Sequence, residues 1–332
     1  MLAFQILDVQ YNSTKPLNAQ DLLPSKTTLQ RRVQDMASAA RTSVTEEVQA
    51  NLSDRLICVT TDMWTDQYKQ LPYITATAHY IDNDWKMKDL VLFTTSFDCT
   101  IKKTAINIHR SLVENFAKLG VDIEAEKKNI VFTTDKGPNI VSALDGYQRL
   151  DCAAHVMSTC LRHTLAEKNN NDAANFIGTC KSLVAFIKKK GYQNMLGKTL
   201  KQSCDSRWNS VYTMIASIRS QYQQLKKVLE DHSNKDVHRL TCIDEELLNE
   251  MEDFLHPFAQ ATTILEGNKY PIVHRVLIVM DMLLKHCENT EGLSPVVTQC
   301  KNDCQALISE KFTPHLLHKV RSNTVTHYCI SY

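Results

Sequence analysis

Five short runs rich in β-forming residues lie in the first half of the chain, and no comparable run follows residue 157. Apolar residues at helical spacing separate the third run from the fourth. Three strands, a helix, a strand, a helix and a strand, in that order, predict a mixed α/β sheet with a helical crossover. The expected strands are 56–61, 73–81, 85–97, 130–134 and 150–156.

The second half of the chain has the pattern of helices alone, because its apolar residues recur every three or four positions. The expected helices are 157–168, 173–190, 209–231, 244–267 and 271–287. A further amphipathic helix precedes the strands. Ser25 suits its N-cap, and its pattern fades near Ala50.

Composition excludes several classes of protein. The chain has 332 residues, of which 43% are hydrophobic and 23% charged, so it is not a disordered chain. Eight glycines and eight prolines are too few for a turn-rich all-β protein. No run approaches 18 apolar residues, so we expect no membrane partner. Eleven cysteines without a secretory signal predict reduced thiols.

The net charge of +1 hides a strong local imbalance. Residues 149–239 contain 15 Lys and Arg against 7 Asp and Glu, whereas residues 240–310 contain 4 against 12. Two interpretations are open. The two segments are solvated helical faces that attract each other, or the basic segment is a surface for nucleic-acid phosphates.

Two aspartates follow β-rich runs. Asp62 is expected to end the first strand and Asp135 to end the fourth. These strands are neighbours if the first is central and the crossover returns beside it. Carboxylates at adjacent strand ends can hold divalent cations, which assist phosphoryl transfer. An aspartate after a strand is also a common turn or helix cap, and Lys136 would partly neutralise Asp135.

Two further clusters allow a functional and a structural interpretation. Cys152 and His155 have a spacing that suits zinc, although a packed cysteine and a hydrogen-bonded histidine explain them as well. Arg207 and Trp208 can meet a phosphate and a base face, or Trp208 can be a core residue.

Six segments, in order, resemble the catalytic region of hAT-superfamily DNA transposases and their domesticated BED-finger relatives. Together they span about residues 20–312. The segments are LLPSKTTLQRRV, TTDMWTD, TTDKGPNIVSAL, LDCAAHVMSTCLRHTL, CDSRWNSVYTMI and DFLHPFAQATTILEGNKYPIVHRVLIVMDMLL.

The resemblance implies an RNase H-like mixed sheet that is interrupted after its fifth strand by an all-helical insertion. The implied organisation is an irregular segment with an amphipathic helix (1–50), the RNase H-like core (51–165), the helical insertion (166–312) and an unplaced tail (313–332).

The resemblance also implies catalytic chemistry. Asp62 and Asp135 would be two of three acids that bind Mg²⁺ or Mn²⁺ and stabilise the charge that develops at phosphorus. The family's third acid is a Glu after the insertion, and no Glu of this chain lies at the matching point. The family's DNA-reading BED finger also has no counterpart before residue 50.

DNA is the partner that the resemblance implies. Arg207 and Trp208 would contact phosphate and stack a flipped base, and Cys152 and His155 would support the active site. We expect a domesticated or truncated nuclear transposase derivative that is not independently active and that binds DNA, protein partners or a second copy. The alternative is an active metal-dependent transposase or nuclease that takes its Glu from an unrecognised helix or a partner chain.

Overall fold

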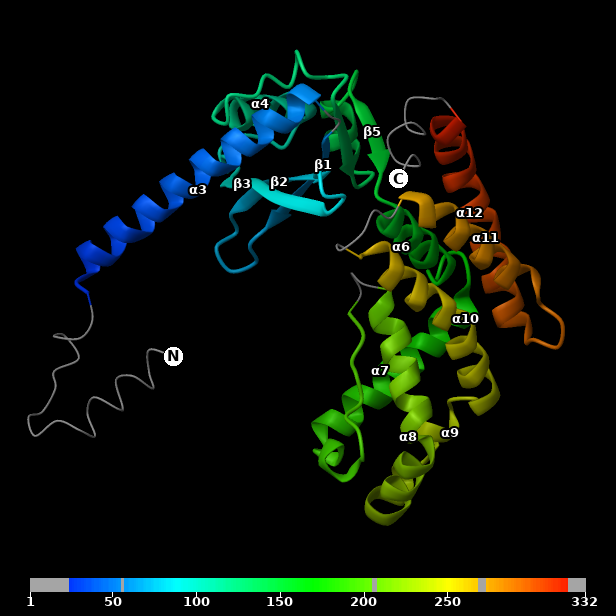
Figure 1. Cartoon of the computed structure of the whole chain (residues 1–332). Coiled ribbons are helices and arrows are strands. Elements are labelled where there is room, and N and C mark those ends of the chain that lie inside the picture. Colours follow the sequence, from blue (N-terminus) through cyan, green and yellow to red (C-terminus); the bar gives the residue numbers. More distant parts are fainter. Residues whose placement is uncertain (1–23, 55–56, 205–207, 268–272, 322–332) are drawn as a thin grey trace, which may run out of the picture. The chain divides into compact units, whose positions relative to one another are not determined.

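The computed structural model describes residues 24–54, 57–204, 208–267 and 273–321 (Figure 1). By its internal contacts the chain divides into two compact units. The first unit comprises Met1–Asp82, Lys88–Phe132 and Ser142–Gln148. The second unit comprises Asn83–Met87, Thr133–Val141 and Arg149–Tyr332.

The strands and the helices among them follow the predicted order. They are α3 (Lys26–Asp54), β1 (Ile57–Thr65), β2 (Pro72–Ile81), β3 (Met87–Ser96), α4 (Ala105–Ala117), β4 (Ile130–Thr134), α5 (Pro138–Ala143) and β5 (Gln148–Asp151). The helices that follow are α6 (Ala153–Thr164), α7 (Asn171–Lys189), α8 (Asn209–Ser233), α9 (His238–Thr241), α10 (Glu245–Leu265), α11 (Val273–Glu288) and α12 (Pro295–Arg321).

The sheet has the strand order β3-β2-β1-β4-β5, so β1 is central and β4 lies beside it. This confirms the predicted mixed α/β sheet and the predicted neighbours. β1 and β2 are antiparallel, with Asp62 opposite Thr75 and Trp64 opposite Tyr73. Burial alternates along both strands, because successive side chains point to opposite faces of a sheet.

Two predicted strand ends were wrong. β1 continues for three residues beyond Asp62 because its pairing with β2 extends to Thr65 and Pro72. Asp62 therefore lies within the strand. β5 ends at Asp151, earlier than residue 156, because Cys152 takes the extended N-cap conformation and α6 begins at Ala153.

The core of the first unit packs aromatic rings between α4 and the sheet. Phe116 of α4 meets Phe93 and Phe132 edge to face, with ring centroids 5.4 and 6.2 Å apart. Thr104 caps α4 through its side chain, and Gly120, at φ 66°, follows the helix where a left-handed residue is required. Ser25 likewise caps α3, its hydroxyl accepting from the Thr28 amide at 3.1 Å.

The second unit has a core built from the apolar stripes of its helices. The five helices predicted after residue 157 correspond to α6, α7, α8, α10 and α11, although α6 begins four residues earlier than expected. α12 was not predicted. It buries Val297, Cys300, Cys304, Ile308 and Phe312.

The backbone of α12 runs past residue 312 to Arg321, so the expected tail begins inside a helix. The predicted boundary between core and insertion at residue 165 stays a prediction. Within the described ranges, no helix combines the length and the hydropathy needed to span a bilayer.

Candidate active-site and DNA-binding residues

Asp62 lies on the exposed face of β1, in the first unit. Thr60, Asp62 and Trp64 alternate with the buried Val59 and Thr61, so all three point to the same face. One carboxylate oxygen of Asp62 accepts a hydrogen bond from the Met63 amide at 2.8 Å. The carboxylate is thus an open oxygen ligand on the central strand.

Asp135 directly follows β4 and lies in the second unit, where it is half-buried. Its Oδ1 accepts a hydrogen bond from the Gly137 amide at 3.1 Å. A Cβ on residue 137 would lie 3.1 Å from the same oxygen, so the glycine leaves room for the carboxylate. The sequence Asp135-x-Gly137 therefore orients the Asp135 side chain and leaves it partly exposed.

Asp151, which was not predicted from the sequence, forms ion pairs with two cationic side chains, one of them next to Asp135 in the sequence. Its carboxylate lies 2.6 Å from Nη2 of Arg149 and 3.2 Å from Nζ of Lys136. Burial acts to raise the pKa of Asp151, but the hydrogen bonds and charges of Arg149 and Lys136 outweigh it and lower the pKa. Lys136 is therefore paired with Asp151, which changes the prediction that it neutralises Asp135.

Arg149 also anchors the end of β4. Its Nη1 donates to the Thr134 hydroxyl at 3.0 Å and to the Asp135 carbonyl at 3.4 Å. The signal that could have identified Asp151 is its position, since it too closes a strand. Its ion pair with Lys136 follows from the tertiary fold, because that lysine comes from the segment after β4, whereas Arg149 lies two residues before Asp151 on β5.

The donor chemistry of Asp62 and Asp135 fits a hard divalent cation, since carboxylate oxygens are the ligands that Mg²⁺ prefers. Their strands are neighbours in the sheet. Within the described ranges, however, no three His, Cys, Asp or Glu side chains gather as a metal site. The described residues thus supply two carboxylates of the three that the resemblance implies.

Cys152 and His155 lie at the start of α6. The Cys152 amide donates to the Thr134 carbonyl at 2.8 Å, which ties the helix to the end of β4 beside Asp135. Burial raises the pKa of the Cys152 thiol, which disfavours the thiolate that zinc requires. His155 is exposed. Their predicted role in supporting the active site stays a prediction.

Trp208 is a core residue of the second unit, with 4% of its surface exposed. In this conformation its ring is not presented to a base. Arg207 lies outside the described residues. The predicted DNA contacts of this pair stay predictions.

A basic pocket lies at the C-terminal end of α7. The segment 173–204 contains six lysines and no Asp or Glu. Two of these lysines line a pocket of about 470 Å³ together with polar side chains. The lining residues are Lys188, Gln193, Thr199, Leu200, Lys201, Gln202 and Thr213.

The pocket is shaped by hydrogen bonds between a side chain and the backbone. These bonds do not use the lysine ammonium groups of the pocket. Gln193 binds the Leu200 amide at 2.7 Å and the Leu200 carbonyl at 3.1 Å, which fixes the pocket wall. No ion pair between described residues involves Lys188 or Lys201. Their ammonium groups are therefore free to meet an anion from solution.

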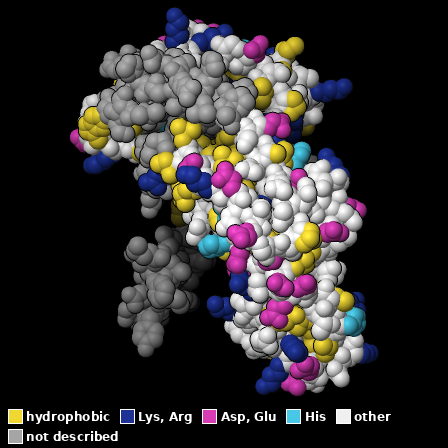
Figure 2. All heavy atoms as spheres, turned by 90° about the vertical axis from the view of Figure 1, so that its right-hand side faces the viewer, with side chains coloured by type: hydrophobic (Ala, Val, Ile, Leu, Met, Phe, Trp, Pro, Cys, Tyr) yellow, Lys and Arg dark blue, Asp and Glu magenta, His cyan; other side chains and the backbone are white. Residues whose placement is uncertain are grey.

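Other charges of the basic segment are neutralised within the fold. Arg219 of α8 pairs with Glu252 and Asp253 of α10 at 3.2 and 2.8 Å. This pairing supports the attraction between helical faces for part of the segment. On the face drawn in Figure 2, Asp and Glu side chains gather over the helical part, with Lys and Arg mostly toward its edges.

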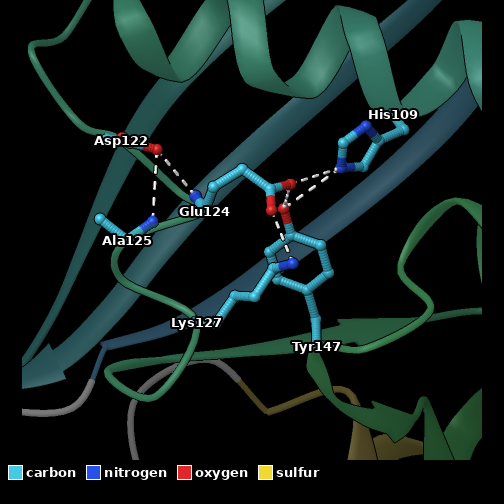
Figure 3. Close-up of polar contacts among 6 residues, drawn as sticks. All are labelled: His109, Asp122, Glu124, Ala125, Lys127 and Tyr147. Carbon is cyan, nitrogen blue, oxygen red and sulfur yellow. Dashed lines mark hydrogen bonds and ion pairs between the residues drawn. The ribbon is translucent and has the colours of Figure 1, made fainter.

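A separate polar cluster joins α4 to the loop before β4 in the first unit (Figure 3). Glu124 accepts from His109 at 2.8 Å, from Lys127 at 2.6 Å and from the Tyr147 hydroxyl. The hydrogen bonds from Lys127 and Tyr147 lower the pKa of Glu124 to about 2. Burial and the Glu124 carboxylate raise the pKa of Tyr147. The polar groups of this cluster bind one another, and they hold the loop before β4 against α4.

Two comparisons with known proteins bear on these residues. Residues 60–166 match the model of the ZBED1 RNase-like domain, which covers Asp62, Asp135 and Cys152. The chain is also 32% identical over 272 residues to the Transposable element Hobo transposase of Drosophila melanogaster. That alignment covers 82% of this chain and 40% of the relative, so the chain spans well under half of the relative's length.

Proposed function

The chain is an hAT-family transposase-derived protein with an RNase H-like core, and from this premise we propose that it binds DNA in the nucleus. The observation that carries the proposal is the basic pocket around Lys188 and Lys201. A phosphodiester backbone is a polyanion that lysines bind by neutralising its phosphates and releasing condensed counterions.

The pocket provides two kinds of phosphate contact. The ammonium groups of Lys188 and Lys201 supply charge, and the Thr199 hydroxyl and the Gln202 amide supply directed hydrogen bonds. Contacts of this kind position DNA without reading its sequence. The chain would therefore hold duplexes of different sequence with similar affinity.

Fluorescence anisotropy with a labelled duplex tests this proposal. Reversing the pocket charges in Lys188→Glu with Lys201→Glu should weaken binding of every duplex alike. The matched control is Lys226→Glu with Lys227→Glu. These exposed lysines lie about 20 Å along α8 from Thr213. Their substitution changes the net charge by the same amount as the substitution of the pocket lysines. Equal losses in both variants would place the DNA elsewhere.

The described residues supply two of the three carboxylates, Asp62 and Asp135. We therefore propose that the chain binds DNA and does not cleave it by itself. A second candidate function is metal-dependent DNA cleavage, with the third ligand a Glu from an unassigned helix or a partner chain. The adjacency of β1 and β4 favours this candidate. Bound Mg²⁺ or Mn²⁺ would supply Lewis-acid chemistry, and Asp62 and Asp135 would hold it.

Calorimetry with Mn²⁺ separates the two candidates. Micromolar binding by the wild type that is lost in Asp62→Ala with Asp135→Ala would favour the cleavage function and justify nicking assays. Asp145→Ala is the control, because Asp145 is an exposed acid that lies in the segment between α5 and β5. Absence of binding by the wild type would favour DNA binding without cleavage.

A further inference from the structure

We infer that the outer edge of β3 is an interface for a second copy of this chain, in which the two β3 strands pair antiparallel about a two-fold axis. β3 is the last strand on its side of the sheet, and among the described residues it pairs only with β2. An edge strand carries a row of backbone amides and carbonyls that another strand can bind. The inference goes beyond the proposed DNA binding and does not depend on it.

The pairing of β3 with β2 determines which backbone groups of β3 point outward. The Phe97 amide donates to the Pro72 carbonyl at 2.8 Å, and the Thr75 and Thr94 hydroxyls, 3.0 Å apart, agree with the same register. Residues that bond to a neighbouring strand alternate along an antiparallel pair, so the odd-numbered residues of β3 bond to β2. The amides and carbonyls of the even-numbered residues therefore point away from β2. These residues are Lys88, Leu90, Leu92, Thr94 and Ser96.

The second half of this edge has the side chains of a strand that pairs. Residues 90–97 contain no charged residue and no proline, the two features by which edge strands are commonly kept from pairing. Val91 lies on the same face as Phe93, whose ring packs on Phe116 of α4. Val91 nevertheless keeps 62% of its surface exposed. A strand added beside β3 would cover this apolar side chain.

Antiparallel pairing about Leu92 makes the strand complementary to itself. In this register the outward amides and carbonyls of the even-numbered residues meet those of the second copy, so they can bond across the interface. Val91 of each copy lies opposite Phe93 of the other. Pairs of an aromatic and a β-branched side chain stabilise neighbouring strands, and the two-fold axis generates this pair twice.

The charges at the start of β3 favour the antiparallel arrangement. Pairing about Leu92 places Lys88 opposite Ser96 and Asp89 opposite Thr95, so no two like charges face each other. Parallel pairing in register would place Lys88 against Lys88 and Asp89 against Asp89, which is destabilising. Antiparallel pairing of two identical strands has two-fold symmetry, so it closes the assembly at two copies. A second copy is therefore the occupant that matches this edge.

Sedimentation equilibrium without DNA tests the inference. The weight-average mass should rise from that of one chain toward that of two as the concentration increases from about 1 to about 100 μM. Val91→Lys should raise the dissociation constant roughly 5- to 30-fold, because both pairs with Phe93 are lost together. Ile278→Lys is the matched control, since Ile278 is an apolar residue on α11 with a similar exposure of 60%. This control should dimerise as the wild type does.

Thr94→Pro and hydrogen exchange test the backbone contacts. The Thr94 amide points outward, so proline at this position spares the bonds to β2, and edge strands tolerate it. Thr94→Pro should weaken the dimer because it removes one outward donor from each copy. In the wild type and in Ile278→Lys, the β3 amides should exchange more slowly at the higher concentration, whereas in Val91→Lys they should not. Circular dichroism would show that each variant is folded.

Three results would overturn the inference. A mass that stays at that of one chain at about 100 μM would exclude the dimer. Equal dissociation constants for Val91→Lys and Ile278→Lys would place the dimer interface elsewhere. Slow exchange of the β3 amides in the monomer would mean that another segment of the same chain covers the edge. The duplex assay with the Lys188 and Lys201 variants is a separate measurement, so failure of the dimer is distinguishable from failure of the proposed DNA binding.

Discussion

The Glu124 carboxylate holds the loop before β4 against α4. Its ionisation makes the free energy of unfolding depend on pH. Its pKa is lowered to about 2 in the folded chain, against 4.5 ordinarily. A lowered pKa means that the stabilisation is present above about pH 4.5 and is lost as the pH falls toward 2. The side chain is 43% exposed, so solvent screening limits the effect.

We therefore expect Glu124→Gln to lower the free energy of unfolding by about 1 kcal/mol or less at pH 7. The difference from the wild type should shrink between pH 4.5 and pH 2, as measured by urea unfolding at several pH values. Glu114→Gln, an exposed change on α4, is the control. A difference that stays constant over this range would contradict the ion-pair account.

Trp208 makes a second prediction at a single position. Because 96% of its surface is buried in the helical core, Trp208→Ala should lower the free energy of unfolding by about 3–5 kcal/mol. Trp85→Ala, at a position that is 62% exposed, should change it by about 0.5 kcal/mol or less. Urea unfolding compares the two, and similar losses would argue against a core role for Trp208.

The sequence allowed some site residues to be identified and concealed others for a physical reason. Asp62 and Asp135 were identifiable because each lies at a β-rich run, a local pattern. Asp151 also closes a strand, two residues after Arg149, but its ion pair with Lys136 forms only in the folded chain. The outward-facing edge of β3 was hidden likewise, since it depends on strand order.

Among the helices, α10 begins with a side-chain cap that can be tested. The Asp244 carboxylate accepts from the Glu246 and Leu247 amides at 2.9 and 3.3 Å. Asp244→Ala should therefore lower the free energy of unfolding by about 1 kcal/mol. Glu230→Ala, an exposed change within α8, tests whether loss of an acidic charge alone accounts for the effect. Equal effects of the two changes would contradict the capping role.

Strands and helices were predictable where their periodicity is strong, and less so at their ends. The extension of β1 to Thr65 is set by its partner strand, which one segment cannot reveal. α12 was missed although its buried positions recur every three or four residues. Two of these positions are cysteines, which behave as small hydrophobic residues when buried and here belong to the core.

For the molecule as a whole, the net charge of +1 gives no hint of nucleic-acid binding. The indication comes from distribution: the run from 173 to 204 has six lysines and no acid, while Arg219 is neutralised by α10. The sequence alone showed the imbalance. Only the fold shows which cations line a pocket and which are paired within the protein.

The salt dependence of duplex binding tests the central claim most directly. For each phosphate that is neutralised, the slope of log K against log salt changes by about 0.9. Lys188→Ala with Lys201→Ala should therefore reduce the magnitude of the slope by about 2, while Lys226→Ala with Lys227→Ala should leave it unchanged. An unchanged slope in the Lys188 and Lys201 variant would contradict DNA binding through this pocket.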